Sequence, residues 1–207
     1  MTAIRSRAAL EAALTQVAAL DPRLAALWRR AGTPDLRRRA PGFAALLRIV
    51  VAQQLSFHAA AAIWRRLEAR CDPPTPEAFL AQDDAGLRRL GLSRQKVRFG
   101  RALASAFAEG RLKPAALARL DDKAAIAALV ELEGIGRWSA ECYLLFSFGR
   151  PDIWPADDLA LATACQGLLD LDQRPRGKEM RALGEAWRPW RSAAARLLWH
   201  GYRKQVV

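Results

Sequence analysis

The sequence predicts an all-α protein. Almost every segment carries apolar residues at helical spacing, and few show the alternation of a strand. Alanine, leucine and arginine, which favour helices, dominate the chain, and clusters of β-branched residues are missing. Proline and glycine divide the chain into many short segments, so a succession of short helices is expected.

Local signals set the limits of these helices. Proline follows a polar residue at Pro22, Pro76 and Pro114, where its missing N–H costs a first helical turn nothing. Gly91 and Gly110 mark breaks after helical segments. In chain order, the expected helices span residues 6–20, 22–31, 42–56, 58–71, 76–82, 84–90, 94–109, 114–119, 122–132, 137–148, 158–170, 177–186 and 190–204.

The charge balance points to a polyanionic partner. Lys and Arg number 33 against 21 Asp and Glu, which gives a formal net charge of +12, and arginine supplies nearly all of the excess. Arginine favours planar, two-point contacts with phosphate, so nucleic acid is the expected partner. A membrane surface would also attract basic charge, but no apolar run reaches the roughly 18 residues of a spanning helix.

Cysteine usage and the N-terminus bear on cofactors and compartment. Cys71, Cys142 and Cys165 are widely spaced, fit no metal-ligand pattern and are too few for a four-cysteine iron–sulfur cluster. We therefore expect plain buried thiols and no iron–sulfur cluster. The first residues lead into a helical pattern and not into the apolar core of a signal peptide, so a cytoplasmic location is expected.

The most informative motif is the stretch 132–138, which contains Gly134 and Gly136 around one aliphatic residue. Two glycines permit positive φ and let backbone N–H groups approach an anion closely. Because both flanking segments are helical, the motif predicts a helix–hairpin–helix. Glycine is also common in ordinary helix–helix turns, but the basic chain, Arg137 and the downstream carboxylate of Asp158 favour a grip on a nucleic-acid phosphate.

Four segments together carry a family resemblance: residues 51–56, 91–96, 132–145 and 155–161. They resemble the helix–hairpin–helix base-excision DNA glycosylases, and among these the DNA-3-methyladenine glycosylase II type. The resemblance implies a two-lobed helical fold with the active cleft between the lobes. One lobe would comprise residues 40–150 with the hairpin, and the other residues 1–39 together with 151–207.

The resemblance implies that Asp158 is the catalytic carboxylate. Breaking an N-glycosidic bond builds positive charge on the sugar, which a nearby carboxylate stabilises while it orients the attacking water. An Asp at a helix N-terminus also tends to stay ionised. The alternative is that Asp157 or Asp158 only caps the helix. We expect catalysis from Asp158, and a cap or an ion pair from Asp157.

Trp138 occupies the position where lyase-competent relatives carry a Schiff-base lysine. Without an amine there, the resemblance implies a monofunctional enzyme with water as the nucleophile. The indole face would attract a cationic alkylated purine by roughly 0.5–2 kcal/mol, although a core role is the alternative for this tryptophan.

Further residues are assigned to the base pocket by the resemblance. Trp190 matches a second aromatic wall, whereas Trp187 is expected in the core. Cys142 stands where the family often has an aromatic residue or methionine, with Tyr143 beside it. This departure leaves the range of accepted bases open.

Residues at the end of the helix expected over 42–56 match the family's DNA-intercalating position. Flipping a base leaves a gap in the stack, which Gln54 would fill, and Gln53 would point into the same cleft. Two polar caps at a helix C-terminus would also explain this pair.

The hairpin is implied to bind DNA phosphate through the N–H groups of Gly134, Gly136 and Trp138. Arg137, Arg94 and Lys96 would be further phosphate contacts or ordinary surface charges. The family also binds a monovalent cation, Na⁺ or K⁺, here through the carbonyls of Val130, Leu132 and Ile135. No other cofactor is implied.

The implied activity is hydrolytic release of 3-methyladenine and 7-methylguanine from duplex DNA by a monomer, leaving an abasic site. Two alternatives stay open. One is a DNA-binding paralogue without turnover, and the other is a glycosylase for deaminated or oxidised bases.

Overall fold

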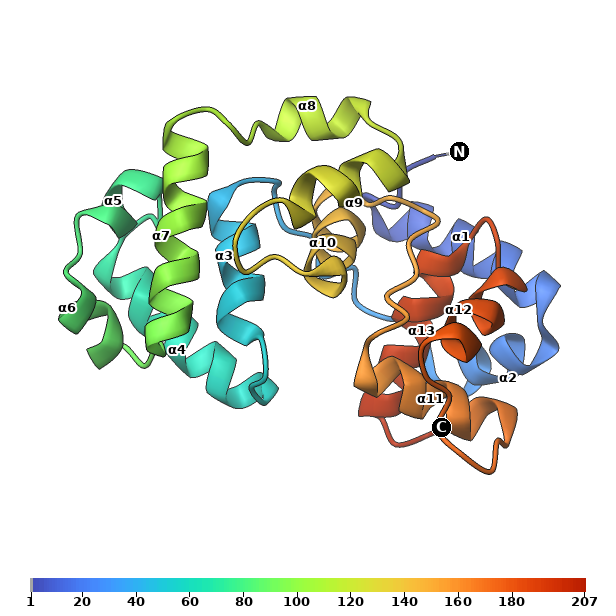
Figure 1. Ribbon diagram of the computed structural model, residues 1–207. Helices are drawn as coiled ribbons and strands as arrows, with labels where there is room; N and C mark the ends of the chain where they lie inside the picture. The colour runs from blue at the N-terminus through green and yellow to red at the C-terminus, as the bar shows by residue number, and fades with distance from the viewer. Residues whose placement is uncertain (1) are drawn as a thin grey trace. The chain divides into compact units, whose positions relative to one another are not determined.

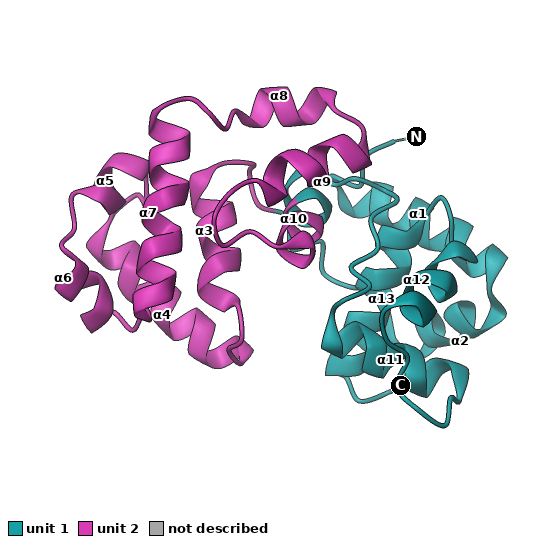
Figure 2. Ribbon diagram, viewed as in Figure 1, with its two compact units in different colours: residues 1–38, 144–207 teal, residues 39–143 magenta. Residues whose placement is uncertain are grey.

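The computed structural model describes residues 2–207, and the part of the chain it describes contains helices and no strand (Figure 1). This confirms the predicted all-α class. The chain divides into two compact units (Figure 2). Residues 1–38 with 144–207 form unit 1, and residues 39–143 form unit 2.

Unit 1 is built around the last helix of the chain. The small residues Ala193, Ala194 and Ala195 have no exposed surface, so neighbouring helices can approach this helix closely. Three of those neighbours, α1, α2 and α11, pack against it. The helical segments of unit 1 are α1 (Arg7–Leu20), α2 (Pro22–Ala31), the π-helical turn η1 (Leu144–Phe148), α11 (Leu159–Leu169), α12 (Lys178–Glu185) and α13 (Arg191–Arg203).

Unit 2 packs around its most apolar helix, α3, which contacts α4, α7 and α10. Phe43 at the start of α3 makes edge-on ring contacts with Phe79 and Phe107, each with centroids 5.9 Å apart. The helices of unit 2 are α3 (Phe43–Ala52), α4 (Phe57–Arg70), α5 (Pro76–Leu80), α6 (Asp84–Arg89), α7 (Arg94–Ala108), α8 (Pro114–Arg119), α9 (Asp122–Val130) and α10 (Arg137–Tyr143).

Polar caps begin most of these helices. In each case a hydroxyl or carboxylate accepts a backbone N–H of the first turn, which satisfies a donor that the helix itself leaves unpaired. The capping residues are Ser6, Asp21, Ser56, Thr75, Asp83, Ser93, Asp121 and Asp158.

Two helices differ from the expected limits, and the other helices begin and end within two residues of them. The helix expected over 42–56 ends at Ala52, because Gln54 adopts a left-handed conformation with φ +57°. The helix expected over 137–148 is α-helical only to Tyr143, and the wider η1 turn follows. No helix among the described residues is long and apolar enough to cross a bilayer.

Candidate functional site

The turn between α9 and α10 requires Gly134 for two reasons. Its φ is +83°, a region that residues with a Cβ rarely adopt. A Cβ on Gly134 would also lie 2.2 Å from Cγ of Phe99, so this glycine is fixed by packing. Within the turn, the N–H of Ile135 donates to the carbonyl of Leu132 at 3.0 Å. The predicted helix–hairpin–helix is therefore present.

Gly136 differs from Gly134 because its surroundings are open. Nothing lies within 4 Å of the place where a Cβ would stand, and the residue is exposed. Within residues 2–207, the N–H groups of Gly134 and Gly136 find no hydrogen-bond acceptor. The hairpin thus presents backbone donors on an accessible surface, which is the chemistry of an anion-binding turn.

Gln53 and Lys96 brace the hairpin and the end of α3. Nε2 of Gln53 donates to the carbonyl of Gly134 at 2.9 Å and to Oγ of Ser139 at 3.0 Å. Nζ of Lys96 donates to the carbonyls of Val51 and Gln53 at 2.7 and 2.8 Å, and burial lowers the pKa of this lysine.

These contacts bear on two expectations. The ammonium of Lys96 binds two carbonyls at the end of α3, which leaves one of its three N–H donors for a phosphate. The amide nitrogen of Gln53 joins α3 to the hairpin and does not point away from the protein toward a base. Gln54, by contrast, is exposed in its left-handed turn.

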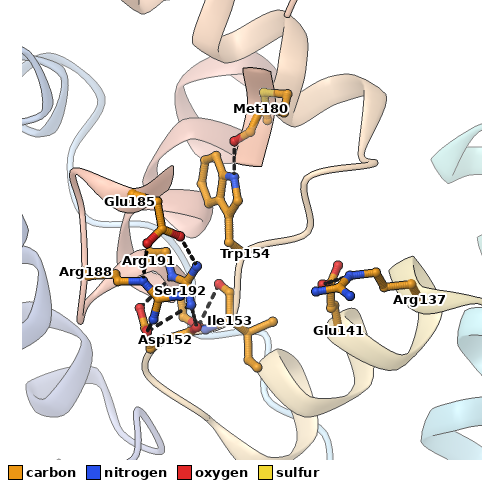
Figure 3. Close-up of polar contacts among 10 residues, drawn as sticks. All are labelled: Arg137, Glu141, Asp152, Ile153, Trp154, Met180, Glu185, Arg188, Arg191 and Ser192. Carbon is orange, nitrogen blue, oxygen red and sulfur yellow. Dashed lines mark hydrogen bonds and ion pairs between the residues drawn. The ribbon is translucent and has the colours of Figure 1, made fainter. Parts of the chain in front are cut away.

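The expected basic contacts lie at the first residues of two helices. Arg94 is exposed at the start of α7. Arg137 begins α10, where its Nε donates to Oε1 of Glu141 at 2.9 Å (Figure 3). This pair orients the arginine, whose side chain stays 58% exposed while that of Glu141 is buried. Arg137 directly follows Gly136 in the sequence, and the ion pair with Glu141 fixes the direction of its side chain.

Helix α10 carries three of the residues assigned to a base pocket. Trp138, its second residue, is half-buried. Cys142 is buried, and Tyr143 has no exposed surface. The Tyr143 hydroxyl accepts the N–H of Gly42 at 2.9 Å, and burial raises the pKa of Tyr143 to about 12. Tyr143 therefore anchors the start of α3 from the interior and offers no surface to a base.

Asp158 is the N-cap of α11 and is half-buried. Its Oδ1 accepts the N–H of Leu161 at 2.7 Å and the indole Nε1–H of Trp199 at 2.9 Å. Asp157 forms an ion pair with Arg181, with Nη1 and Oδ1 3.5 Å apart. The ion pair expected of Asp157 is confirmed, and the cap belongs to Asp158. Two donors thus fix the orientation of one carboxylate at a helix N-terminus.

Trp199 is the residue that the sequence interpretation missed. Its ring stacks on Phe146, with centroids 5.6 Å apart and planes inclined by 22°. The guanidinium of Arg196 lies over the Phe146 ring at 4.8 Å and donates to the carbonyl of Leu145 at 2.9 Å. Burial lowers the pKa of Arg196 to about 10. The helical spacing of Trp199 within α13 does not by itself indicate a contact with Asp158 or Phe146.

The other two tryptophans near α13 have different surroundings. Trp190 is half-buried at the N-cap of α13 and gives no side-chain cap. Trp187 is 1% exposed, and its Nε1–H donates to Oδ2 of Asp21 at 2.9 Å. The core position expected for Trp187 is confirmed. Trp199, which contacts Asp158, lies nine positions after Trp190, the residue that the resemblance assigns to the base pocket.

The chain leading to Asp158 is fixed by polar contacts with α12 and α13 (Figure 3). Buried Asp152 binds Arg188 and Arg191, each at 2.7 Å. The N–H of Ile153 donates to Oγ of Ser192 at 2.9 Å. The indole of Trp154 donates to a carbonyl of α12 at 2.7 Å. This bracing holds the segment that delivers Asp158.

A pocket of about 390 Å³ lies beside Asp158 within unit 1. Its volume is in the range of about 300–1,000 Å³ that is usual for ligand sites. Its lining combines acidic, basic and apolar groups: Ala156, Asp157, Asp158, Leu159, Ala162, Arg174, Pro175, Arg176 and Gly177.

Side-chain metal ligands do not gather anywhere in the described residues, where no group of three His, Cys, Asp or Glu could hold an ion. The thiols of Cys71, Cys142 and Cys165 are buried, as expected. A cation at the hairpin would be bound by backbone carbonyls. Val130 ends α9, and Leu132 and Ile135 follow in the turn before α10, where the Leu132 carbonyl accepts the N–H of Ile135.

Comparison with known proteins gives a consistent result. Residues 47–189 match the model of the HhH-GPD superfamily of base excision DNA repair proteins. The DNA-3-methyladenine glycosylase 1 of Schizosaccharomyces pombe is 35% identical over 158 residues, which are 74% of this chain and 69% of that protein. A putative DNA-3-methyladenine glycosylase of Bacillus subtilis is 32% identical over 61% of this chain and 44% of its own length.

Solved structures agree. The S. pombe 3-methyladenine DNA glycosylase in complex with abasic DNA superposes with a TM-score of 0.82 at 32% identity, covering 90% of this chain and 94% of that one. The DNA-3-methyladenine glycosidase of Bacillus halodurans gives a TM-score of 0.75 at 29% identity, covering 97% and 91%.

Proposed function

Because the chain belongs to the HhH-GPD superfamily of base excision DNA repair proteins, we propose that it is a monofunctional DNA glycosylase. Its substrates would be alkylated purines such as 3-methyladenine and 7-methylguanine in duplex DNA. The relatives named as 3-methyladenine glycosylases support this substrate class. The observation that carries the proposal is the oriented carboxylate of Asp158 beside an accessible pocket.

Asp158 performs the chemical step. As the bond between C1′ and the purine nitrogen breaks, its electron pair goes to the base and positive charge develops on the sugar. The carboxylate stabilises that charge and orients a water, which adds to C1′ and releases a proton. An N3- or N7-alkylated purine is already cationic, so it leaves as a neutral base. Leu161 N–H and Trp199 Nε1–H hold the carboxylate in place for this step.

Trp138 provides a stacking face for the flipped cationic base. No amine stands at this position, so no imine with the sugar forms there and the strand is not cut. The product is an abasic site in an intact strand. Trp190 and Cys142 stay proposed as further walls of the base pocket.

The hairpin binds the DNA backbone without reading sequence. The open N–H groups of Gly134 and Gly136, with Arg137 beside them, take one phosphate, and Arg94 contacts another. A Na⁺ or K⁺ ion at the hairpin carbonyls would add positive charge next to that phosphate. Gln54 fills the gap that the flipped nucleotide leaves in the stack. The protein acts as a monomer.

A base-release assay tests the proposed activity. Duplex DNA carrying methylated purines is incubated with the protein, and released bases are separated by chromatography. Free 3-methyladenine and 7-methylguanine, with no strand cleavage, are expected. Binding without release would mean a non-catalytic DNA-binding protein. Selective release of hypoxanthine or oxidised guanine would mean a different lesion class.

The two hairpin glycines test the DNA grip separately. Gly136→Ala places a methyl group in open space, so the folded protein keeps its stability but binds undamaged duplex more weakly. Gly134→Ala forces a methyl group against Phe99 and is expected to destabilise unit 2. Unchanged duplex affinity in a folded Gly136→Ala variant would contradict the grip.

A further inference from the structure

The segment 171–177 between α11 and α12 forms one side of the pocket that Asp158 lines. It contributes two arginines, Arg174 and Arg176, together with the buried ring of Pro175. None of the sequence motifs described above includes these residues. A basic wall therefore faces the same pocket as the carboxylate proposed for catalysis.

The pocket arginines differ from the third arginine nearby. Arg181 is paired with Asp157. Within residues 2–207, the guanidinium groups of Arg174 and Arg176 form no hydrogen bond or ion pair with the protein, whereas many other arginines of unit 1 do. Two unneutralised guanidinium groups at one pocket are repelled by each other and are stabilised by an anionic ligand.

The backbone of this segment is already ordered. Nε2 of Gln166 donates to the carbonyl of Leu171, and the Leu171 N–H donates back to the carbonyl of Gln166. The N–H of Arg176 donates to Oε2 of Glu179 at 3.3 Å, and the Glu179 N–H donates to the Arg176 carbonyl at 3.0 Å. The two arginines therefore extend from a fixed backbone, which lowers the cost of ordering them on a ligand.

We propose that Arg174 and Arg176 bind a phosphodiester next to the flipped nucleotide whose sugar contacts Asp158. This inference rests on the proposed glycosylase function. A nucleotide carries its phosphates a few bonds from C1′, so a sugar at Asp158 brings a phosphate to the pocket wall. Without local positive charge, that phosphate would be repelled by Asp157 and Asp158. The planar fork of a guanidinium fits two phosphate oxygens at once.

The site orients the sugar as well as holding the strand. A phosphate fixed at Arg174 and Arg176 limits how the flipped nucleotide can rotate, and so keeps C1′ facing the carboxylate. The hairpin grip involves backbone donors of unit 2, whereas this second contact involves side chains of unit 1. Loss of the second contact should therefore affect lesion-containing DNA more than undamaged DNA.

Binding to a duplex with a tetrahydrofuran abasic analogue tests the site without requiring turnover. Arg174→Ala and Arg176→Ala should each weaken this binding about tenfold and reduce the slope of log affinity against log salt concentration by about 1. Arg29→Ala, which removes an exposed charge of α2 outside the pocket, is the matched control and should leave the affinity within about twofold. Thermal unfolding checks that each variant is folded.

Neutral phosphates identify the contact directly. In duplexes where one phosphate flanking the analogue is a methylphosphonate, the unaltered protein should lose affinity at one position. At that position, the neutral phosphate should weaken binding by the Arg174→Ala and Arg176→Ala variants only slightly, because these variants already lack an arginine that contacts it. If the loss of affinity from the neutral phosphate and the loss from the arginine substitution add at every flanking position, the proposal is wrong. A protein that releases no methylpurine but shows this coupling would disprove the glycosylase function and leave the phosphate site standing.

Discussion

Unit 1 contains the same local arrangement twice, with opposite surroundings. Asp21 caps α2 and Asp158 caps α11, and each carboxylate accepts an indole N–H at 2.9 Å, from Trp187 and Trp199 respectively. Asp21 is only 4% exposed and is bound in two-point fashion by Arg23. Asp158 is half-buried and lines a pocket.

The difference separates a carboxylate that serves the fold from one that is open to a ligand. A carboxylate that is buried and neutralised by an arginine stabilises the fold and meets no substrate. A half-buried carboxylate that lines a pocket is open to a ligand. The cap and the indole contact are shared, so the proposal that Asp158 is the catalytic carboxylate depends on the pocket.

The largest expected effect is on the activity of Asp158→Asn. Asparagine still caps a helix and still offers an oxygen to Leu161 and Trp199, so the fold is retained. The charge is lost, and the rate of base release should fall at least about a hundredfold. Single-turnover release of methylpurine from methylated duplex measures it.

The corresponding change in the other pair, Asp21→Asn, is the control. It should leave the release rate within about twofold at a temperature where the protein is folded, because a site away from substrate contributes nothing to the chemical step. Full activity in Asp158→Asn would refute the assignment of the carboxylate, and loss of activity in folded Asp21→Asn would remove the contrast between the pairs.

A smaller effect is expected for Trp199→Phe. The new ring can keep the stack on Phe146, but the Nε1–H that orients Asp158 is gone. Release should slow about tenfold, since one hydrogen bond to a charged group is removed. Affinity for the abasic-analogue duplex should stay nearly unchanged, because Trp199 acts through Asp158. A parallel loss of affinity would mean that Trp199 instead contacts the DNA.

Trp199 also illustrates what the sequence could and could not predict. The hairpin and most helix limits come from short-range signals, and these predictions agree with the structure except at the ends of the helices expected over 42–56 and 137–148. The contact between Trp199 and Asp158 joins residues 41 positions apart through the packing of α13 on α11. Helical spacing gives no information on which tryptophan faces the carboxylate, so the sequence does not predict Trp199 as a partner of Asp158.

Lys96 shows the same limit for a charged residue. A lysine three residues after the capping Ser93 has the pattern of a surface charge. Only the packing of α7 on α3 brings its ammonium to the carbonyls of Val51 and Gln53. Composition predicts the basic character of the protein, but it does not separate exposed arginines from a lysine whose ammonium binds the carbonyls at the end of a helix.

The two aspartates should also differ in their contribution to stability, where Asp21 should matter more than Asp158. Asp21→Ala removes the cap of α2 and leaves the buried indole N–H of Trp187 without its acceptor. The free energy of unfolding should fall by about 2 kcal/mol. Asp158→Asn should change it by less than about 1 kcal/mol, since the acceptor stays. Urea unfolding followed by circular dichroism measures both, and an equal loss in the two variants would contradict the distinction.

The smallest expected effect is on the stability of the fold at acidic pH. Burial alone would raise the pKa of Asp21, but hydrogen bonds from Arg23 and Trp187 outweigh it and hold this pKa below the usual 3.8. Above about pH 4 the carboxylate is ionised in both states, and its native contacts stabilise the fold in full. As the pH falls below that value, the unfolded chain takes up the proton first, so stability declines.

The part of this decline in unfolding free energy that depends on Asp21 should be at most about 1 kcal/mol, because Arg23 is 56% exposed and solvent screens the pair. Unfolding free energies of the native protein and Asp21→Asn, measured between pH 3 and pH 6, isolate it. The variant should show the shallower decline toward low pH, because it has no proton to gain at this position. Parallel curves would mean that Asp21 is held by its neutral hydrogen bonds alone.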